Sequence, residues 1–171
     1  GEYDLILSPL VGEHSQLINR PLFKEPLKFV IPSDHPLAGN AFVKPHQLRG
    51  EKVLTLEDRH HFHHQVQHIC DKIGASLQRD YEGTSLDTLR QMVVMGMGVA
   101  FLPGLYIHSE LHHPEALHVC EIDSMPIERQ HALTWRNTAP DRQTFREISE
   151  IIRHIIATRL SGAVKIVGLD D

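Results

Sequence analysis

The chain of 171 residues contains only two cysteines, Cys70 and Cys120. Two are too few for the disulfide framework of a small secreted domain, and they fit a reducing cytosol. No apolar run approaches the roughly 20 residues that a membrane-spanning helix needs. There is also no charged segment followed by an apolar one of the kind that begins a secreted protein. We therefore expect a cytoplasmic protein that has no membrane partner.

An excess of basic residues is also missing. Lysine and arginine together number 17 against 22 acidic residues, for a net charge of -5. Proteins that bind nucleic acid normally carry a basic patch, so any DNA contact should be made by a part of the protein outside this chain. Motifs of catalysis are absent too: there is no nucleophile elbow, phosphate-binding loop or carboxylate pair in a motif. The sequence therefore predicts no enzyme activity and no cofactor.

Short apolar runs alternate with segments of helical periodicity along the chain. One helix carries its apolar face from Phe62 to Ile73 and ends at Gly74, and the next begins at Thr84 or Ser85. Strands are predicted over residues 4–7, 27–31, 52–56, 77–81, 99–102, 117–122 and 131–135. This alternation predicts an α/β fold with largely parallel strand pairing.

The C-terminal part of the chain predicts one long helix and a tail. The helix is expected to begin around Pro140, with Asp141 in its first turn. Its apolar stripe consists of Phe145, Ile148, Ile151, Ile152, Ile155 and Ile156. The tail, residues 161–171, is expected to be a loose end.

Several motifs, in order, resemble the effector domain of LysR-type transcriptional regulators. Residues 83–103 read GTSLDTLRQMVVMGMGVAFLP, which is similar to the family segment that supplies one wall of the effector cleft. Two further motifs resemble the crossover and the turn between the lobes of this family, namely PLFKEPL at residues 21–27 and DHPLA at residues 34–38. The segment GEKVLTLED at residues 50–58, followed by Gln65 and Cys70, resembles the OxyR-like branch.

The resemblance implies a periplasmic-binding-protein-like fold of two lobes with an effector cleft between them. Residues 1–26 would belong to lobe I, 27–124 would form lobe II, 125–160 would return to lobe I, and 161–171 would form the C-terminal tail. In the family, other elements of the first lobe and a winged helix-turn-helix precede the equivalent of Asp4. We therefore expect an incomplete first lobe and no DNA-binding domain in this chain. Family membership also implies a homodimer or homotetramer.

The reactive thiol of the OxyR-like branch is missing from the matching position. In that branch a GHC motif carries the cysteine that attacks peroxide, and a second cysteine resolves it. Here the segment reads Arg59-His60-His61, while Cys70 stands where the resolving cysteine would be. Imidazole forms neither a sulfenic acid nor a disulfide, so that switch is not expected to operate. Cys70 remains the redox candidate, with core packing as the alternative, and Cys120 would serve as its partner only if the fold brought the two together.

Histidine is the residue present in excess, with 14 copies, five of them between His60 and His68. His60, His64 and His68 recur at i,i+4, a spacing that suits zinc, copper or nickel. No cysteine or carboxylate at ligand spacing on the same face completes a set of four ligands, so no metal site is predicted. A metal-sensing regulator that uses these three histidines, and a solvated helix start, remain the alternatives.

The same histidines also stand near the start of a helix that would border the effector cleft. Helix starts attract anions through their exposed N–H groups, and Thr84 and Ser85 open the neighbouring helix in the same way. Simple N-capping is the alternative role for these two hydroxyls. We expect a small anionic effector that binds by closure of the lobes. The predicted effector-binding residues are Ser8, His60, His61, His64, Thr84 and Ser85.

Together these observations predict the effector-sensing domain of a LysR-type DNA-binding regulator. It would bind a small effector, or sense a redox or metal signal, in the cleft between the lobes. DNA would be contacted only through the domain that this chain lacks. A periplasmic-type solute-binding protein, which shares the fold, is the alternative from another functional class.

Overall fold

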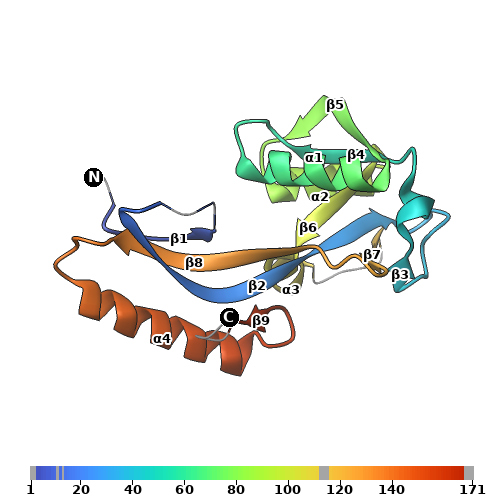
Figure 1. The fold of residues 1–171 in the computed structure, drawn as a ribbon. Coiled ribbons are helices and arrows are strands. Elements are labelled where there is room, and N and C mark those ends of the chain that lie inside the picture. The colour runs from blue at the N-terminus through green and yellow to red at the C-terminus, as the bar shows by residue number, and fades with distance from the viewer. Residues whose placement is uncertain (1–2, 11, 13, 112–115, 168–171) are drawn as a thin grey trace. The chain divides into compact units, whose positions relative to one another are not determined.

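The computed structural model describes residues 3–10, 12, 14–111 and 116–167 (Figure 1). The strands are β1 (Leu5–Pro9), β2 (Leu17–Pro32), β3 (Phe42–Val43), β4 (Lys52–Leu56), β5 (Ser76–Gly83), β6 (Val99–Pro103), β7 (Leu117–Ile122), β8 (Glu128–Arg136) and β9 (Lys165–Ile166). The helices are the 3-10 helix η1 (Pro45–Leu48) and the α-helices α1 (His61–Ile73), α2 (Leu86–Val94), α3 (Gly104–Glu110) and α4 (Arg142–Arg159). Among these helices, none is both long enough and apolar enough to span a membrane.

Contacts between Cα atoms divide the chain into two compact units. Unit 1 consists of Gly1–Pro26 and Glu128–Asp171, and unit 2 consists of Leu27–Ile127. The chain therefore passes between the units twice. The first passage lies inside the long strand β2, and the second lies directly before β8.

Unit 2 is an α/β unit in which β4 lies between β6 and β5 and is parallel to both. The four residues from Val53 to Leu56 are all buried, as expected for a parallel strand that is covered on both faces. Helix α1 follows β4 and ends at Gly74, whose φ of 75° is the left-handed conformation that glycine adopts most easily. Gly98 precedes β6, where an added Cβ would lie 2.6 Å from the carbonyl oxygen of Lys52. The close approach of these two backbone segments therefore requires glycine.

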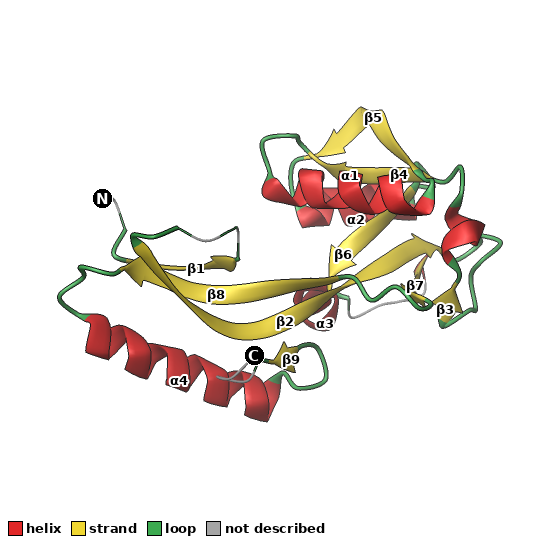
Figure 2. Ribbon diagram, in the orientation of Figure 1, coloured by secondary structure: helices red, strands yellow, loops and turns green. Residues whose placement is uncertain are grey.

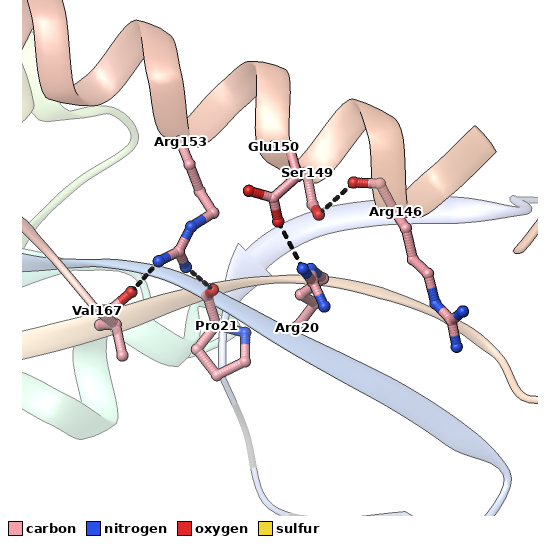
Figure 3. Close-up of polar contacts among 7 residues, drawn as sticks. All are labelled: Arg20, Pro21, Arg146, Ser149, Glu150, Arg153 and Val167. Carbon is pink, nitrogen blue, oxygen red and sulfur yellow. Dashed lines mark hydrogen bonds and ion pairs between the residues drawn. The ribbon is translucent and has the colours of Figure 1, made fainter. Parts of the chain in front are cut away.

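Unit 1 is an antiparallel sheet with one long helix packed along it. Strand β8 lies between β1 and β2, and Figure 2 shows α4 beside this sheet. The rings of Trp135 and Phe145 pack 5.9 Å apart between β8 and α4. Arg153 of α4 donates hydrogen bonds to the carbonyl oxygens of Pro21 and Val167, and Arg20 pairs with Glu150 (Figure 3). These polar contacts attach α4 both to β2 and to the C-terminal segment.

The structure confirms every predicted strand and helix, but it corrects the predicted pairing. Five of the ladders among the described residues are antiparallel and three are parallel. The prediction of largely parallel pairing is therefore wrong. The antiparallel pairing arises mainly from β2, which is 16 residues long and forms antiparallel ladders with β6, β7, β8 and β9. Only its second half was predicted as a strand.

The C-terminal segment is a second correction. Its described part is not a loose end, because Lys165–Ile166 forms β9 against β2, and Val164 and Val167 are buried. Residues 168–171 lie outside the described part of the chain. A smaller correction concerns α4, which begins at Arg142, so that Asp141 is its N-cap rather than a residue of the first turn. Strands β3 and β9 and helix α3 were not predicted.

Candidate ligand site at the starts of two helices

The starts of α1 and α2 lie at the same edge of the unit 2 sheet. They follow the neighbouring parallel strands β4 and β5, whose last residues, Leu56 and Gly83, are paired. The backbone N–H of Glu57 donates to the carbonyl oxygen of Gly83 at 3.2 Å, which joins the two segments directly after the strands. The carboxyl ends of adjacent parallel strands thus bring His60 and His61 to the same edge as the Thr84–Ser85 turn.

The two helix starts differ in how they are capped. Ser85 is the N-cap of α2, and its hydroxyl accepts a hydrogen bond from the backbone N–H of Thr88 at 3.2 Å. The predicted capping role is therefore confirmed for Ser85, whereas the hydroxyl of Thr84 only contacts that of Thr88, at 3.4 Å. His60 is the N-cap of α1, and its side chain makes no capping hydrogen bond. The uncapped start of α1 has more free capacity to bind an anion than the start of α2.

The histidines at the start of α1 have different environments. His61 and His64 are exposed, whereas His60 is half-buried, and its buried Nε2 has no hydrogen-bond partner within the described part of the chain. His63 is also half-buried. Its Nδ1 lies 2.9 Å from the carbonyl oxygen of Leu56 and 3.8 Å from Oε1 of Glu82. Because a carbonyl only accepts, Nδ1 carries the hydrogen and donates it.

His63 is the site residue that the sequence prediction missed. It follows His60 by three residues, and residues at i,i+3 share a helix face, so the spacing could have indicated it. Its bond to Leu56 fixes the ring against the end of β4, while the rings of His63 and His64 meet edge to face at 5.5 Å. His63 is therefore the most firmly oriented of the imidazoles near this helix start.

The remaining predicted residues are placed less favourably. His68 is exposed, two turns further along α1 than His61. Within the described ranges, no three histidine, cysteine or acidic side chains lie together where they could hold a metal ion. Ser8 is a half-buried residue of β1 and belongs to unit 1, whereas the other predicted effector residues belong to unit 2.

Carboxylates also occur near the two helix starts, and two of them have partners. Glu57 pairs with Arg59 at 2.6 Å, and Asp87 in the first turn of α2 accepts a hydrogen bond from the hydroxyl of Tyr106 at 2.7 Å. Burial, together with this bond to Asp87, raises the pKa of Tyr106 above its ordinary value. The carboxylates of Glu57 and Asp87 are therefore engaged, whereas His61 and His64 are exposed.

Both cysteines are free and buried, Cys70 in α1 and Cys120 in β7. Burial raises the pKa of Cys70 to about 12, with the nearby charge of Asp71 as a smaller cause. Burial also raises the pKa of Cys120 to about 11. A thiol reacts as its thiolate, so both side chains are poor nucleophiles near neutral pH. This placement favours core packing over a redox role for Cys70.

Comparison with known proteins gives consistent matches across the chain. The family described as LysR substrate binding domain matches residues 1–156. The DNA-binding transcriptional dual regulator OxyR of Escherichia coli K12 is 35% identical over 153 residues, which are 90% of this chain and 50% of the regulator. A hydrogen peroxide-inducible genes activator of Pectobacterium carotovorum is 36% identical over 155 residues. The chain spans about half the length of these curated relatives.

Solved structures show the same fold. The reduced form of OxyR superposes with a TM-score of 0.78 at 32% identity, covering 91% of this chain and 72% of that one. The reduced OxyR regulatory domain of Pseudomonas aeruginosa gives a TM-score of 0.76 at 29% identity, covering 90% and 74%. These matches confirm the predicted mixed α/β fold of the periplasmic-binding-protein type.

Proposed function

Because the chain belongs to the LysR substrate-binding domain family and is an OxyR-like regulatory domain rather than an enzyme, we propose that it senses a small anionic effector. The effector binds at the starts of α1 and α2 in unit 2. Contacts come from His60, His61 and His64 on one side and from the Thr84–Ser85 turn on the other.

The observation that carries this proposal is the pairing of two helix starts at one sheet edge. Each start presents N–H groups and the positive end of a helix dipole, and Glu57 and Gly83 hold the two starts side by side. The start of α1 lacks a side-chain cap, and exposed imidazoles lie beside it. A carboxylate would bind the N–H groups of α1 and gain further hydrogen bonds from the histidines.

The proposed signal is not a thiol switch. His61 stands where the OxyR-like branch carries its reactive cysteine, and an imidazole cannot be oxidised to a disulfide. Cys70 is buried with a pKa of about 12, which disfavours attack on peroxide near neutral pH. A ligand that binds by contact therefore accounts for the site better than an oxidant does.

In the full-length protein this domain works with a DNA-binding domain that lies outside the 171 residues of this chain. We assign unit 2 to lobe II and unit 1 to part of lobe I, and Ser8 of unit 1 stays among the proposed effector residues. Effector binding shifts the balance between two conformations, by about 1–3 kcal/mol in typical regulators. The regulator acts in the cytoplasm as a homodimer or homotetramer.

The test is a thermal-shift titration of metal-stripped protein with acetate, malonate, citrate and phosphate. An anion at 100 times its dissociation constant adds about 2.7 kcal/mol, which raises the Tm of a domain of this size by about 5–10 °C. We expect the shift to disappear in His61→Ala. His68→Ala, which removes an exposed histidine of the same helix, is the matched control and should keep it.

Two results would count against the proposal. If the anion stabilises His61→Ala as much as the unmodified protein, the assigned site is wrong. If zinc alone stabilises the protein, and His60→Ala and His64→Ala abolish the effect, the domain is a metal sensor instead. Ser85→Ala is less decisive here, because it also removes the cap of α2.

A further inference from the structure

Unit 1 contains a buried ionic cluster that the effector site does not use. The carboxylate of Glu25, whose residue is only 2% exposed, accepts from Nη2 of Arg129 at 2.6 Å and contacts Nε2 of His131 at 2.7 Å. Both bonds go to the same oxygen, Oε2. The imidazole of His131 also stacks on the ring of Phe23, with the centroids 4.7 Å apart. Three charged or titratable side chains thus lie together, with Glu25 and His131 buried and Arg129 half-buried.

The register of two strands brings these side chains together. Glu25 of β2 is paired with Arg129 of β8, and Phe23 is paired with His131. Residues two apart on a strand share one face of the sheet, so all four side chains lie on the same face. A shift of register between Pro21 and Phe23 leaves Leu22 unpaired in this ladder, and both Leu22 and Phe23 are buried.

The cluster lies where the chain passes between the two units. Glu25 is followed by Pro26, after which the chain passes from unit 1 into unit 2. The chain returns to unit 1 at Glu128, the residue directly before Arg129. The two strands are joined on both sides of this point. Pro26 pairs with Glu128 in unit 1, and the backbone N–H of Leu27 donates to Ile127 at 2.8 Å in unit 2. The two connections therefore form one two-stranded ribbon.

The hydrogen bonding of the cluster is incomplete, which distinguishes it from an ordinary core contact. Nδ1 of His131 is buried and has no hydrogen-bond partner among the residues that the structure describes. Apolar side chains of similar volume often stabilise a core as well as a buried ion pair does. A partly satisfied polar network is also weaker than a complete one. Such a cluster specifies a register while remaining easier to open than an apolar core.

We propose that Glu25, Arg129 and His131 form a clamp that holds the two connecting strands in register, and that opening the clamp lets this ribbon bend. Only the purpose of this bending rests on the proposed function, because the bending would relay effector binding from unit 2 to unit 1. The clamp itself is a property of unit 1 and of the ribbon.

Hydrogen exchange followed by mass spectrometry on the whole chain, without ligand, tests the clamp. Glu25→Gln removes the charge, and His131→Phe keeps an aromatic ring over Phe23 but removes the contact with Glu25. We expect both variants to speed amide exchange at least about tenfold in residues 22–31 and 126–132, with α1 and β4 unchanged. Lys165→Gln is the matched control, because it breaks the exposed pair with Glu128 at the same strands.

Two outcomes would overturn the clamp. One is unchanged exchange in both ribbon segments of a folded variant. The other is a uniform rise across both units, which would show a general loss of stability instead. If Glu25→Gln does not fold, His131→Phe decides the question alone. Since no anion is present, failure here leaves the effector site untouched, and failure of His61→Ala leaves the clamp untouched.

Discussion

The two units of this chain differ in how many polar side chains they bury beside their apolar ones. Unit 2 has a continuous apolar core, made by β2, β4, β6 and β7 with α1 and α2. Unit 1 buries apolar side chains such as Trp135 and Phe145 together with the polar residues Glu25, His131 and Ser149, and arginine contacts also attach α4. It also leaves several large apolar side chains of β1, β2, β9 and α4 exposed, namely Ile6, Leu7, Leu17, Ile151, Ile155 and Ile166.

This difference indicates which contacts maintain each unit. Burial of apolar surface is the largest favourable contribution to folding, so unit 2 carries most of its stability in its own core. Unit 1 adds polar contacts between α4 and its strands, such as those of Arg153 and Arg20, to its apolar packing.

The largest expected effect is in the core of unit 2. The rings of Phe29 and Phe101 pack 5.3 Å apart, and Phe101 is fully buried. Phe101→Ala should lower the free energy of unfolding by about 3–5 kcal/mol, through lost burial and the cavity left behind. Urea denaturation measures it, with Phe42→Ala, at a 62% exposed position, as the control that should change little. Equal losses in both variants would contradict the account of the core.

Two neighbouring isoleucines of α4 allow the same comparison of a buried with an exposed side chain in unit 1. Ile156 is 4% exposed and Ile155 is 43% exposed. Ile156→Ala should cost about 2–4 kcal/mol, whereas Ile155→Ala should stay within about 0.5 kcal/mol. The same denaturation experiment compares them. A large loss from Ile155→Ala would mean that this face of α4 is covered in solution.

The reactivity of the two buried thiols tests how well the core of unit 2 excludes water and prevents thiolate formation. Folded-state pKa values of about 12 for Cys70 and about 11 for Cys120 exceed the ordinary thiol value of about 8.5. The folded protein thus retains protons that the unfolded chain releases, so this contribution to stability is present below pH 8.5 and declines as the pH rises toward 11–12. At pH 8 a disulfide reagent should label the folded protein at least about 100-fold more slowly than the urea-unfolded chain. Rapid labelling of the folded protein would show that the core opens.

The smallest effect concerns the cap of α2 at the candidate site. Ser85→Ala should cost about 1 kcal/mol, because the N–H of Thr88 loses its acceptor. Thr84→Ala should cost less, since the hydroxyl of Thr84 makes only a long contact, of 3.4 Å, with that of Thr88. Thermal denaturation of both variants measures the difference. If Thr84→Ala were the more damaging change, the cap assignment would be wrong.

Much of unit 2 could be predicted because its signals are local. The predicted strand over residues 52–56 matches β4, the helix that ends at Gly74 is α1, and Ser85 caps α2 as its position indicated. Periodicity and capping depend on residues within a few positions of one another, so they can be recognised in the sequence itself. The choice of His60 and Ser85 as neighbours came from the family resemblance, and the parallel pairing of β4 with β5 places both at one edge.

The antiparallel ladders of β2, the docking of β9 and the Glu25–His131 contact were decided only by the tertiary structure. Glu25 and His131 are 106 residues apart, and no local pattern relates a glutamate before a proline to a histidine in a distant strand. The same holds for His63, whose orientation depends on a carbonyl of β4. By itself the sequence determined most of the strands and helices, with β3, β9, α3 and the first half of β2 as the exceptions, because that choice is made largely by neighbouring residues. Which segments pair, and which polar groups are buried together, depends on contacts that exist only once the chain has folded.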